Sequence, residues 1–244
     1  MEEIKNMKMN LKKIAKWSLV LFSVMLVCFI GDCPKAQAAT KAQYTYKTYD
    51  KSKTYKGKKS TIKDVEKYKR VILKGDSEAV KKINQVLEEV CDAAVKEMPT
   101  GSAEYAAEHL SYDDEYRNVY TSRVTYNANG VISIMISYEW YQGGVLDYGC
   151  DGYTFDLATG EQLKLTDVCN GSDRTLMKKI KNKLIRKYSI DAFSQSSVDE
   201  LSADKCDFYL NKGGKAVVVF DKYEIAAGAA GAFDVTLNSK YYGK

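Results

Sequence analysis

Residues 118–141, with the sequence NVYTSRVTYNANGVISIMISYEWY, decide the fold class of this chain. Apolar and polar side chains alternate on both sides of the turn at residues 127–130, which ends in Asn-Gly. This pattern predicts a β-hairpin with strands at residues 118–126 and 131–141, because Asn-Gly suits the tight turn between antiparallel strands. If the isoleucines of the second strand face the core, Tyr138 and Trp140 continue that face and Tyr141 lies on the opposite one.

Further strands and helices are predicted on both sides of this hairpin. The strands lie at residues 148–157, 161–165, 208–210, 216–221 and 232–237. Two longer helices are predicted at residues 76–98 and 173–188, where apolar side chains recur at helical spacing. A short helix at residues 102–110 contains His109, which we expect to be a surface or capping residue. The order predicts an α+β fold, an antiparallel sheet with two main amphipathic helices packed on one face.

The first 38 residues have the three parts of a secretory signal peptide. A lysine-rich start is followed by an apolar run at residues 17–30, and Ala36-Gln37-Ala38 forms a cleavage site of small residues. The apolar run is shorter than the roughly 20 residues that span a bilayer, which favours a cleaved signal peptide. A retained membrane anchor and a lipid-modified Cys33 are the alternatives. We therefore expect a protein that is secreted or at the cell surface and meets the membrane only before cleavage.

Residues 39–59 form a segment rich in lysine and tyrosine ahead of a single domain at residues 60–244. The segment is either a flexible arm or edge strand, whose lysines discourage further pairing, or a basic aromatic arm that touches an anionic cell-wall polymer. The net charge of the full chain is +5, and most of this charge leaves with the signal peptide. The nearly neutral remainder argues against a nucleic-acid partner.

Four cysteines remain after cleavage, Cys91, Cys150, Cys169 and Cys206, and an even number in an exported protein indicates disulfides. The turn at residues 158–160 joins two predicted antiparallel strands, and pairing across it places Cys150 opposite Val168 or Cys169. We therefore expect a Cys150–Cys169 disulfide, which leaves Cys91 to pair with Cys206. Four unpaired thiols are the alternative.

The composition excludes several kinds of catalytic site. The single histidine cannot supply a zinc site with two or three histidines, and a Ser-His-Asp triad would depend on it alone. No phosphate-binding or dinucleotide-binding glycine motif occurs. Two carboxylate pairs, Asp147 with Asp151 and Asp113 with Asp114, could serve glycan hydrolysis, but such pairs are usually solvated loop residues. We expect a non-enzymatic protein with no metal and no cofactor.

Aromatic residues gather around Gly143 and Gly144, and tyrosine and tryptophan are enriched at binding hot spots. We expect residues 143–148 to form a loop without a tight turn, whose apolar side chains are available to a ligand. The predicted ligand-binding residues are Tyr141, Gly143, Gly144, Val145, Leu146, Asp147 and Tyr148. The alternative is that Val145 and Leu146 lie under the end of the sheet.

Three stretches of the sequence resemble a known family. They are SYEWYQGG at residues 137–144, GYTFDLATGEQLKLTD at residues 152–167 and FDKYEIAAGAAG at residues 220–231. Together they resemble the extracellular domain of RsiV-type anti-sigma factors, which is similar to the non-catalytic N-terminal domain of PdaC-type peptidoglycan deacetylases. The chain departs from the family in having Val145-Leu146 where Ala-His is frequent, and Ala227 where proline is usual.

The resemblance implies an exported recognition module, with lysozyme as the ligand in the RsiV case. We therefore expect a secreted, non-enzymatic binding module of the bacterial cell envelope that recognises a lysozyme-like protein or a cell-wall glycan such as peptidoglycan. The alternative function is a cell-wall glycan hydrolase or modifying enzyme that uses paired carboxylates. A purely structural envelope protein is a third class.

Overall fold

The computed structural model describes residues 41–97, 102–189 and 198–243. All described residues belong to one compact unit, Ala38–Lys244. The predicted signal peptide at residues 1–38 and the predicted helix end at residues 98–101 lie outside the described residues. The same holds for Cys33.

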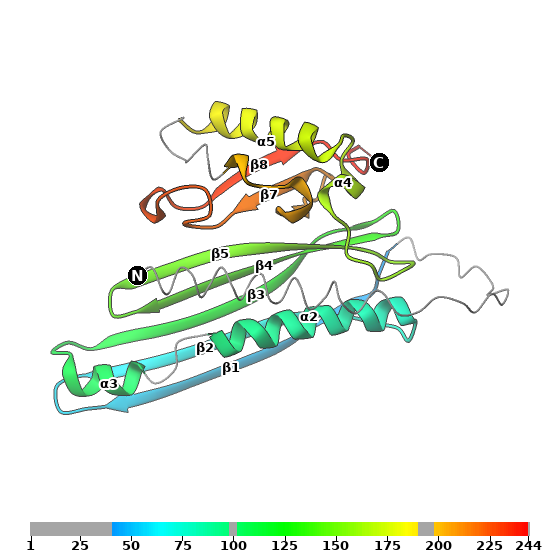
Figure 1. Cartoon of the computed structure of the whole chain (residues 1–244). Coiled ribbons are helices and arrows are strands. Elements are labelled where there is room, and N and C mark those ends of the chain that lie inside the picture. The colour runs from blue at the N-terminus through cyan, green and yellow to red at the C-terminus, as the bar shows by residue number, and fades with distance from the viewer. Residues whose placement is uncertain (1–40, 98–101, 190–197, 244) are drawn as a thin grey trace. The chain divides into compact units, whose positions relative to one another are not determined.

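Five strands form the larger sheet, in the spatial order β1-β2-β3-β4-β5 (Figure 1). The strands are β1 (Tyr44–Lys56), β2 (Thr61–Leu73), β3 (Asp114–Ala128), β4 (Val131–Gln142) and β5 (Val145–Asp156). Neighbouring strands are antiparallel except β2 and β3, which run parallel and are connected through α2 (Glu78–Glu97) and α3 (Ser102–His109). The sheet is therefore mostly antiparallel, as the hairpin pattern predicts.

The hairpin predicted from residues 118–141 is confirmed as β3 and β4. Asn129 and Gly130 have φ angles of 55° and 76°, the left-handed values that a two-residue turn requires at both positions. Asn129 also donates a 2.7 Å hydrogen bond from Nδ2 to the Tyr126 hydroxyl. Both strands extend beyond their predicted bounds at the end of the hairpin away from the turn.

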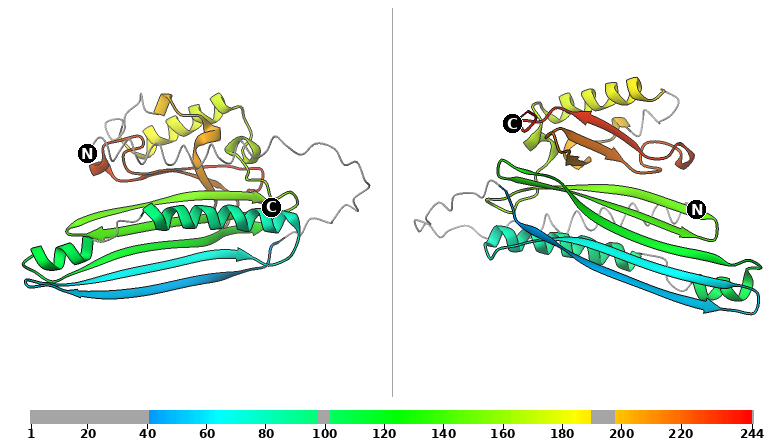
Figure 2. Two further views of the ribbon diagram at one scale, coloured as in Figure 1. Left: turned by 60° about the horizontal axis from the view of Figure 1, so that its bottom comes forward. Right: turned by 180° about the vertical axis from the view of Figure 1, so that it is seen from behind.

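Helix α2 packs on one face of the larger sheet (Figure 2). Ser77 begins it, because its hydroxyl oxygen accepts a 3.2 Å hydrogen bond from the backbone N–H of Val80. The predicted apolar stripe is buried, with Ile83 and Leu87 packed against Phe155 and the isoleucines of β4. The short helix α3 packs its alanines against Ile62 and Tyr116. His109 is exposed and stacks on Tyr105, as expected for a surface residue.

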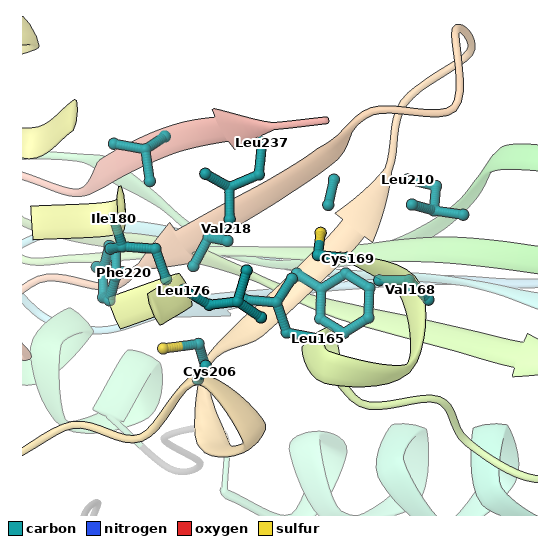
Figure 3. Packing of buried hydrophobic residues seen from close by; sticks show 14 of the residues in the cluster. Leu165, Val168, Cys169, Leu176, Ile180, Cys206, Leu210, Val218, Phe220 and Leu237 are labelled. Atoms are coloured by element: carbon teal, nitrogen blue, oxygen red, sulfur yellow. The ribbon is translucent and has the colours of Figure 1, made fainter. Parts of the chain in front are cut away.

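Three further strands form a second sheet in the order β6-β7-β8. They are β6 (Asp207–Leu210), β7 (Ala216–Phe220) and β8 (Phe233–Leu237), and they pair antiparallel. Helix α5 (Asp173–Lys187) covers this sheet through Leu176, Ile180 and Leu184, which are at most 1% exposed. Figure 3 shows Leu176 and Ile180 directed toward Val218 and Phe220 of β7.

The α+β class with antiparallel pairing is confirmed, but the strands form two sheets and each main helix packs on its own sheet. The division arises where a strand was predicted at residues 161–165. Pairing there stops at a single bridge between Phe155 and Gln162, and the chain turns into the short helix α4 (Leu165–Val168). The chain thus leaves the larger sheet before the second sheet begins.

Small residues allow the second sheet to approach the larger one closely. The backbone N–H of Leu210 in β6 donates a 2.8 Å hydrogen bond to the Ser133 hydroxyl, which also lies 2.8 Å from the Thr154 hydroxyl. Beside them, Gly152 faces the backbone of Phe208. The first half of β4 is therefore buried on both faces, by α2 on one side and by β6 on the other.

The lysine- and tyrosine-rich segment is an edge strand rather than a flexible arm. β1 pairs with β2 along its whole length of 13 residues, and Asn127 exchanges two 2.8 Å hydrogen bonds with the backbone of Ala42. The sheet therefore begins before residue 60, where the domain was predicted to start. Nearly all of β1 is exposed on both faces.

Within the described ranges, no helix combines the length and the apolar content that crossing a bilayer requires.

Candidate functional site

The predicted loop at residues 143–148 is a tight turn followed by a strand. β4 ends at Gln142, β5 begins at Val145, and these two residues pair across Gly143 and Gly144. The two glycines have φ angles of 57° and 85°, so they form the two-residue turn that favours consecutive left-handed residues. The prediction of a loop without a tight turn was wrong, because two glycines adopt this geometry at little steric cost.

The pairing register divides the predicted binding residues between the two faces of the sheet. Tyr141 lies opposite Leu146, and Glu139 lies opposite Tyr148. Because directly opposed side chains share a face, Tyr141, Leu146 and Tyr148 lie together. Val145 and Asp147 alternate with them along β5 and lie on the other face. The structure thus brings three of the predicted side chains together and separates two from them.

Arg117 and Val119 of β3 join the same face, since they lie opposite Tyr141 and Glu139. We call this surface the hairpin face. Its members are Arg117, Val119, Glu139, Tyr141, Leu146 and Tyr148. Beside it lies an open hollow of about 300 Å³, lined by Val119, Ser137, Tyr138, Glu139, Tyr148 and Gly149.

The apolar side chains near the turn are exposed. Val145 is 56% exposed, Leu146 is 46% exposed and Tyr148 is 42% exposed. These values exclude the alternative in which Val145 and Leu146 lie under the end of the sheet. Large apolar side chains that gather on a surface commonly mark a site of interaction.

Lys222, in the segment after β7, supports the hairpin from the outer edge of β5. Its ammonium group donates a 3.1 Å hydrogen bond to the backbone oxygen of Leu146 and lies 3.6 Å from Asp147 Oδ1. The same group lies 4.4 Å from the centre of the Tyr148 ring, a cation–π distance. Lys222 therefore fixes the backbone, a carboxylate and an aromatic ring of the same strand.

Asp221 makes the adjacent contacts to β5. Its carboxylate accepts hydrogen bonds from the backbone N–H of Cys150 at 3.2 Å and from the Tyr138 hydroxyl at 3.3 Å. Gly149 leaves the necessary space, because a Cβ atom there would lie 2.5 Å from both Asp221 Oδ1 and the Tyr138 hydroxyl. Burial first, and the charge of Asp221 second, raise the pKa of the Cys150 thiol to about 12.

Arg117 is a further member of the hairpin face that the sequence pattern did not single out. Its guanidinium group lies 3.7 Å from Glu139 Oε1 and 5.6 Å from the centre of the Tyr141 ring. Both charged side chains are about half exposed, so this ion pair contributes little to stability. Arginine beside tyrosine is a frequent composition of binding hot spots.

One member of each carboxylate pair considered for glycan hydrolysis contacts another part of the fold. Asp147 pairs with Lys222, and Asp113 accepts a 2.6 Å hydrogen bond from the backbone of Thr61. Asp147 and Asp151 are four residues apart on one strand, so about 13 Å separates their Cα atoms, whereas glycosidase carboxyl groups lie about 5–9.5 Å apart. Among the described residues, no group of three or more His, Cys, Asp or Glu side chains is arranged to hold a metal ion.

The predicted disulfides are not formed. Cys91, Cys150 and Cys169 carry free thiols, and the Cys206 thiol lies 3.4 Å from the backbone oxygen of Ser202. The strand pairing that would place Cys150 near Cys169 ends at Gln162, and Cys150 lies opposite Ser137 instead. Cys169 follows α4, in the cluster between α5 and the second sheet. Cys206 belongs to that same cluster, whereas Cys91 is part of α2 and packs against the larger sheet. The predicted partners are thus separated by the division into two sheets.

A known protein family matches the C-terminal part of the chain. Residues 169–240 match the family described as "Protein of unknown function (DUF3298)". The DUF3298 match contains α5, the second sheet and the segment with Asp221 and Lys222 that supports the hairpin. It leaves out the larger sheet and covers less than half of the chain. None of the curated proteins matches the chain.

Two solved structures of the DUF3298 family are similar to this chain. A DUF3298 member from Bacteroides fragilis NCTC 9343 is 16% identical, with a TM-score of 0.55 over 82% of this chain and 92% of the other. A DUF3298 protein from Pseudomonas aeruginosa PAO1 is 13% identical, with a TM-score of 0.49 over 81% of this chain and 92% of the other. At such identities the first likeness shows the fold alone, and that fold extends over both sheets.

Proposed function

We propose that this chain is an exported, non-enzymatic binding domain of the bacterial cell envelope whose hairpin face holds a lysozyme-like protein. The observation that carries the proposal is the exposure of Leu146 and Tyr148 on a strand end that is fixed in place. A two-residue turn and Lys222 hold these side chains before any ligand arrives. Such preorganisation lowers the entropic cost of binding.

The chemistry of the hairpin face suits a protein ligand. Leu146 supplies an aliphatic anchor, Tyr141 and Tyr148 supply rigid aromatic area, and the Arg117–Glu139 pair supplies polar contacts at the rim. A projecting apolar strand end can enter a cleft on a partner protein. The adjacent hollow, lined by Tyr148 and Glu139, would instead favour a sugar ring, so peptidoglycan is the second candidate ligand.

The sequence resemblance to RsiV-type and PdaC-type domains supports this proposal, because in the RsiV case it implies an exported module that binds lysozyme. The DUF3298 match and the similar fold support the same resemblance at a coarser level. Export itself rests on the predicted signal peptide at residues 1–38. Val145-Leu146 in place of Ala-His makes the hairpin end more apolar than the family pattern.

Leu146→Asp is expected to weaken the binding of lysozyme by at least about 10-fold, because it places a charge in the apolar centre of the hairpin face. The melting temperature is expected to stay nearly unchanged, since Leu146 is half exposed and a surface substitution costs little. Titration calorimetry with lysozyme and a thermal unfolding curve measure the two effects separately.

Ile185→Asp provides the matched control, because Ile185 is an exposed aliphatic residue on α5, 36% exposed. It should leave lysozyme binding unchanged. Equal binding by wild type and Leu146→Asp would overturn the assignment of the hairpin face, and so would a loss of binding that only accompanies unfolding. Retention of the chain by purified peptidoglycan, but not by lysozyme, would make the glycan the ligand.

A further inference from the structure

Helix α5 has a large excess of positive over negative charge. It contains seven basic residues, Arg174, Lys178, Lys179, Lys181, Lys183, Arg186 and Lys187, and one acidic residue, Asp173. The net charge of the full chain is +5, so the residues outside this helix have no net positive charge. Helix α5 alone therefore has a net charge of +6, which exceeds that of the full chain.

The basic residues form the outer surface of α5, which lies over β7 and β8 (Figure 1). Leu176, Ile180 and Leu184 occupy the opposite side and are buried against the second sheet. At 100° of rotation per residue, the basic side chains cover about 240° of the helix circumference. Six of the seven basic residues are exposed, and Lys181 is half-buried.

Within the described residues, ion pairs neutralise only two of these seven charges. Lys181 pairs with Asp199 at 2.6 Å, and Lys187 pairs with Asp234 at 2.8 Å. No ion pair joins Arg174, Lys178, Lys183 or Arg186 to an acidic residue in the part of the chain that the structure describes. These four side chains are exposed, and among the described residues no acidic group neutralises them.

Folding does not account for this arrangement. Basic residues in the last turn, Arg186 and Lys187, interact favourably with the helix dipole, but Arg174 and Lys178 lie near the N-terminal end, where positive charge is unfavourable. Arg174 and Lys178 are also four residues apart, so they repel each other across one turn. The helix keeps charges that do not stabilise it, which points to a role in binding.

The dimensions of the surface suit an extended ligand. The fifteen residues of α5 give a length of about 22 Å. An open hollow of about 230 Å³ runs beside it, lined by Arg174, Met177, Lys178, Lys181, Val198, Asp199 and Leu201. A flexible chain of anionic groups could follow the basic residues along the helix and around its side.

We propose that the outer surface of α5 binds a linear phosphodiester polymer of the cell envelope. The proposal rests on the export part of the proposed function and is independent of the hairpin face. An anionic bilayer fits less well, because the apolar side of α5 is buried in the core and cannot insert among lipids. A flat bilayer would also reach only part of a basic surface that extends about 240° around the helix.

The test compares two variants of the full chain that lose the same charge. The α5 variant carries Arg174→Gln, Lys178→Gln, Lys183→Gln and Arg186→Gln. The control variant carries Lys47→Gln, Lys56→Gln, Lys58→Gln and Lys59→Gln, at exposed positions of β1 and the turn after it. Glutamine keeps a good helix propensity, so α5 should remain folded, which circular dichroism checks.

Binding is measured against three probes, which are unsubstituted poly(glycerol phosphate), phosphatidylglycerol vesicles and single-stranded DNA. The α5 variant is expected to bind poly(glycerol phosphate) at least about 30-fold more weakly than wild type. The control variant is expected to bind like wild type, and wild-type affinity should fall as salt rises. Lysozyme binding by the α5 variant should be unchanged, which separates this surface from the hairpin face.

The opposite results would overturn the proposal. Loss of polymer binding in the control variant rather than in the α5 variant would place the site on β1, the basic aromatic segment. Tighter binding of wild type to vesicles or to DNA than to poly(glycerol phosphate) would assign α5 to a membrane surface or to nucleic acid. Weak binding of all three probes by wild type would show that the charge on α5 serves no polyanion.

Discussion

Gly152→Ala is expected to lower the free energy of unfolding by about 3 kcal/mol, because it inserts an atom where the two sheets touch. A Cβ atom at Gly152 would lie 1.9 Å from the backbone oxygen of Phe208 and 2.1 Å from its carbonyl carbon. These are backbone atoms of β6, so they cannot move aside as the end of a flexible side chain could. The substitution must push β6 away from β5 or distort one of the strands.

The loss spreads to the polar contacts beside Gly152. Moving β6 outward lengthens the 2.8 Å hydrogen bond from the Leu210 backbone N–H to the Ser133 hydroxyl. Ser133 and Thr154 are at most 1% exposed, and a buried polar group that loses its partner is destabilising. We therefore expect the interface between the sheets to weaken as a unit rather than at one atom.

Gly213→Ala is the control for this prediction. The nearest atom to a Cβ at Gly213 is Asn211 Oδ1 at 3.5 Å, an ordinary contact, so the expected change is within about 0.5 kcal/mol. Urea unfolding of both variants measures the difference. Equal stability of Gly152→Ala and wild type would show that the close approach of Phe208 to β5 is not a feature of the folded protein.

The sequence pattern correctly predicted those turns and helices whose conformation depends on residues close together in the sequence. Asn129-Gly130 identified the β3–β4 hairpin because those residues readily adopt the left-handed conformation of its turn. The apolar stripes of α2 and α5 identified both helices because each must bury one side. The same rule covers Gly143-Gly144, whose tight turn was missed although two adjacent glycines are a known signal for it.

Other elements escaped prediction because their patterns are ambiguous or depend on distant contacts. In β2 the apolar residues Ile62, Val65, Tyr68 and Val71 recur every third position, which does not match the period of two that identifies strands. Its pairing with β3 spans a long connection through two helices. The division into two sheets depends on the end of pairing with β5 at Gln162, which no turn residue indicates.

Only part of the candidate site was predicted, because some of its residues come together through strand register and distant contacts. Tyr141, Leu146 and Tyr148 were singled out from composition near the glycines, and the structure places them on one face. Arg117 joins that face through the register of β3 against β4, which a single strand pattern does not reveal. Lys222 contacts Leu146 across 76 residues of sequence, and only the resemblance at residues 220–231 indicated that its segment matters.

The thiols of Cys150 and Cys169 are expected to react very slowly with iodoacetamide in the folded protein at pH 8. Burial is the largest cause that raises their pKa, from 9.0 to about 12 for Cys150 and to about 11 for Cys169. Since only the thiolate reacts, the rates should fall about 1000-fold and about 100-fold below those of the same thiols in denaturant. Mass spectrometry of peptides over a time course measures each rate.

The same shifts give a dependence of stability on pH. The folded state keeps protons that the unfolded chain loses near pH 9, so this contribution to stability is complete below pH 9 and is lost as the pH rises toward 12.

Asp221→Asn is the control for the alkylation experiment, because it removes the second cause of the shift in the pKa of Cys150. It should speed the alkylation of Cys150 and leave that of Cys169 unchanged. In denaturant without reductant, Cys91, Cys150, Cys169 and Cys206 should all be alkylated. A peptide pair linked through Cys150 and Cys169 would restore the disulfide that the sequence alone suggested.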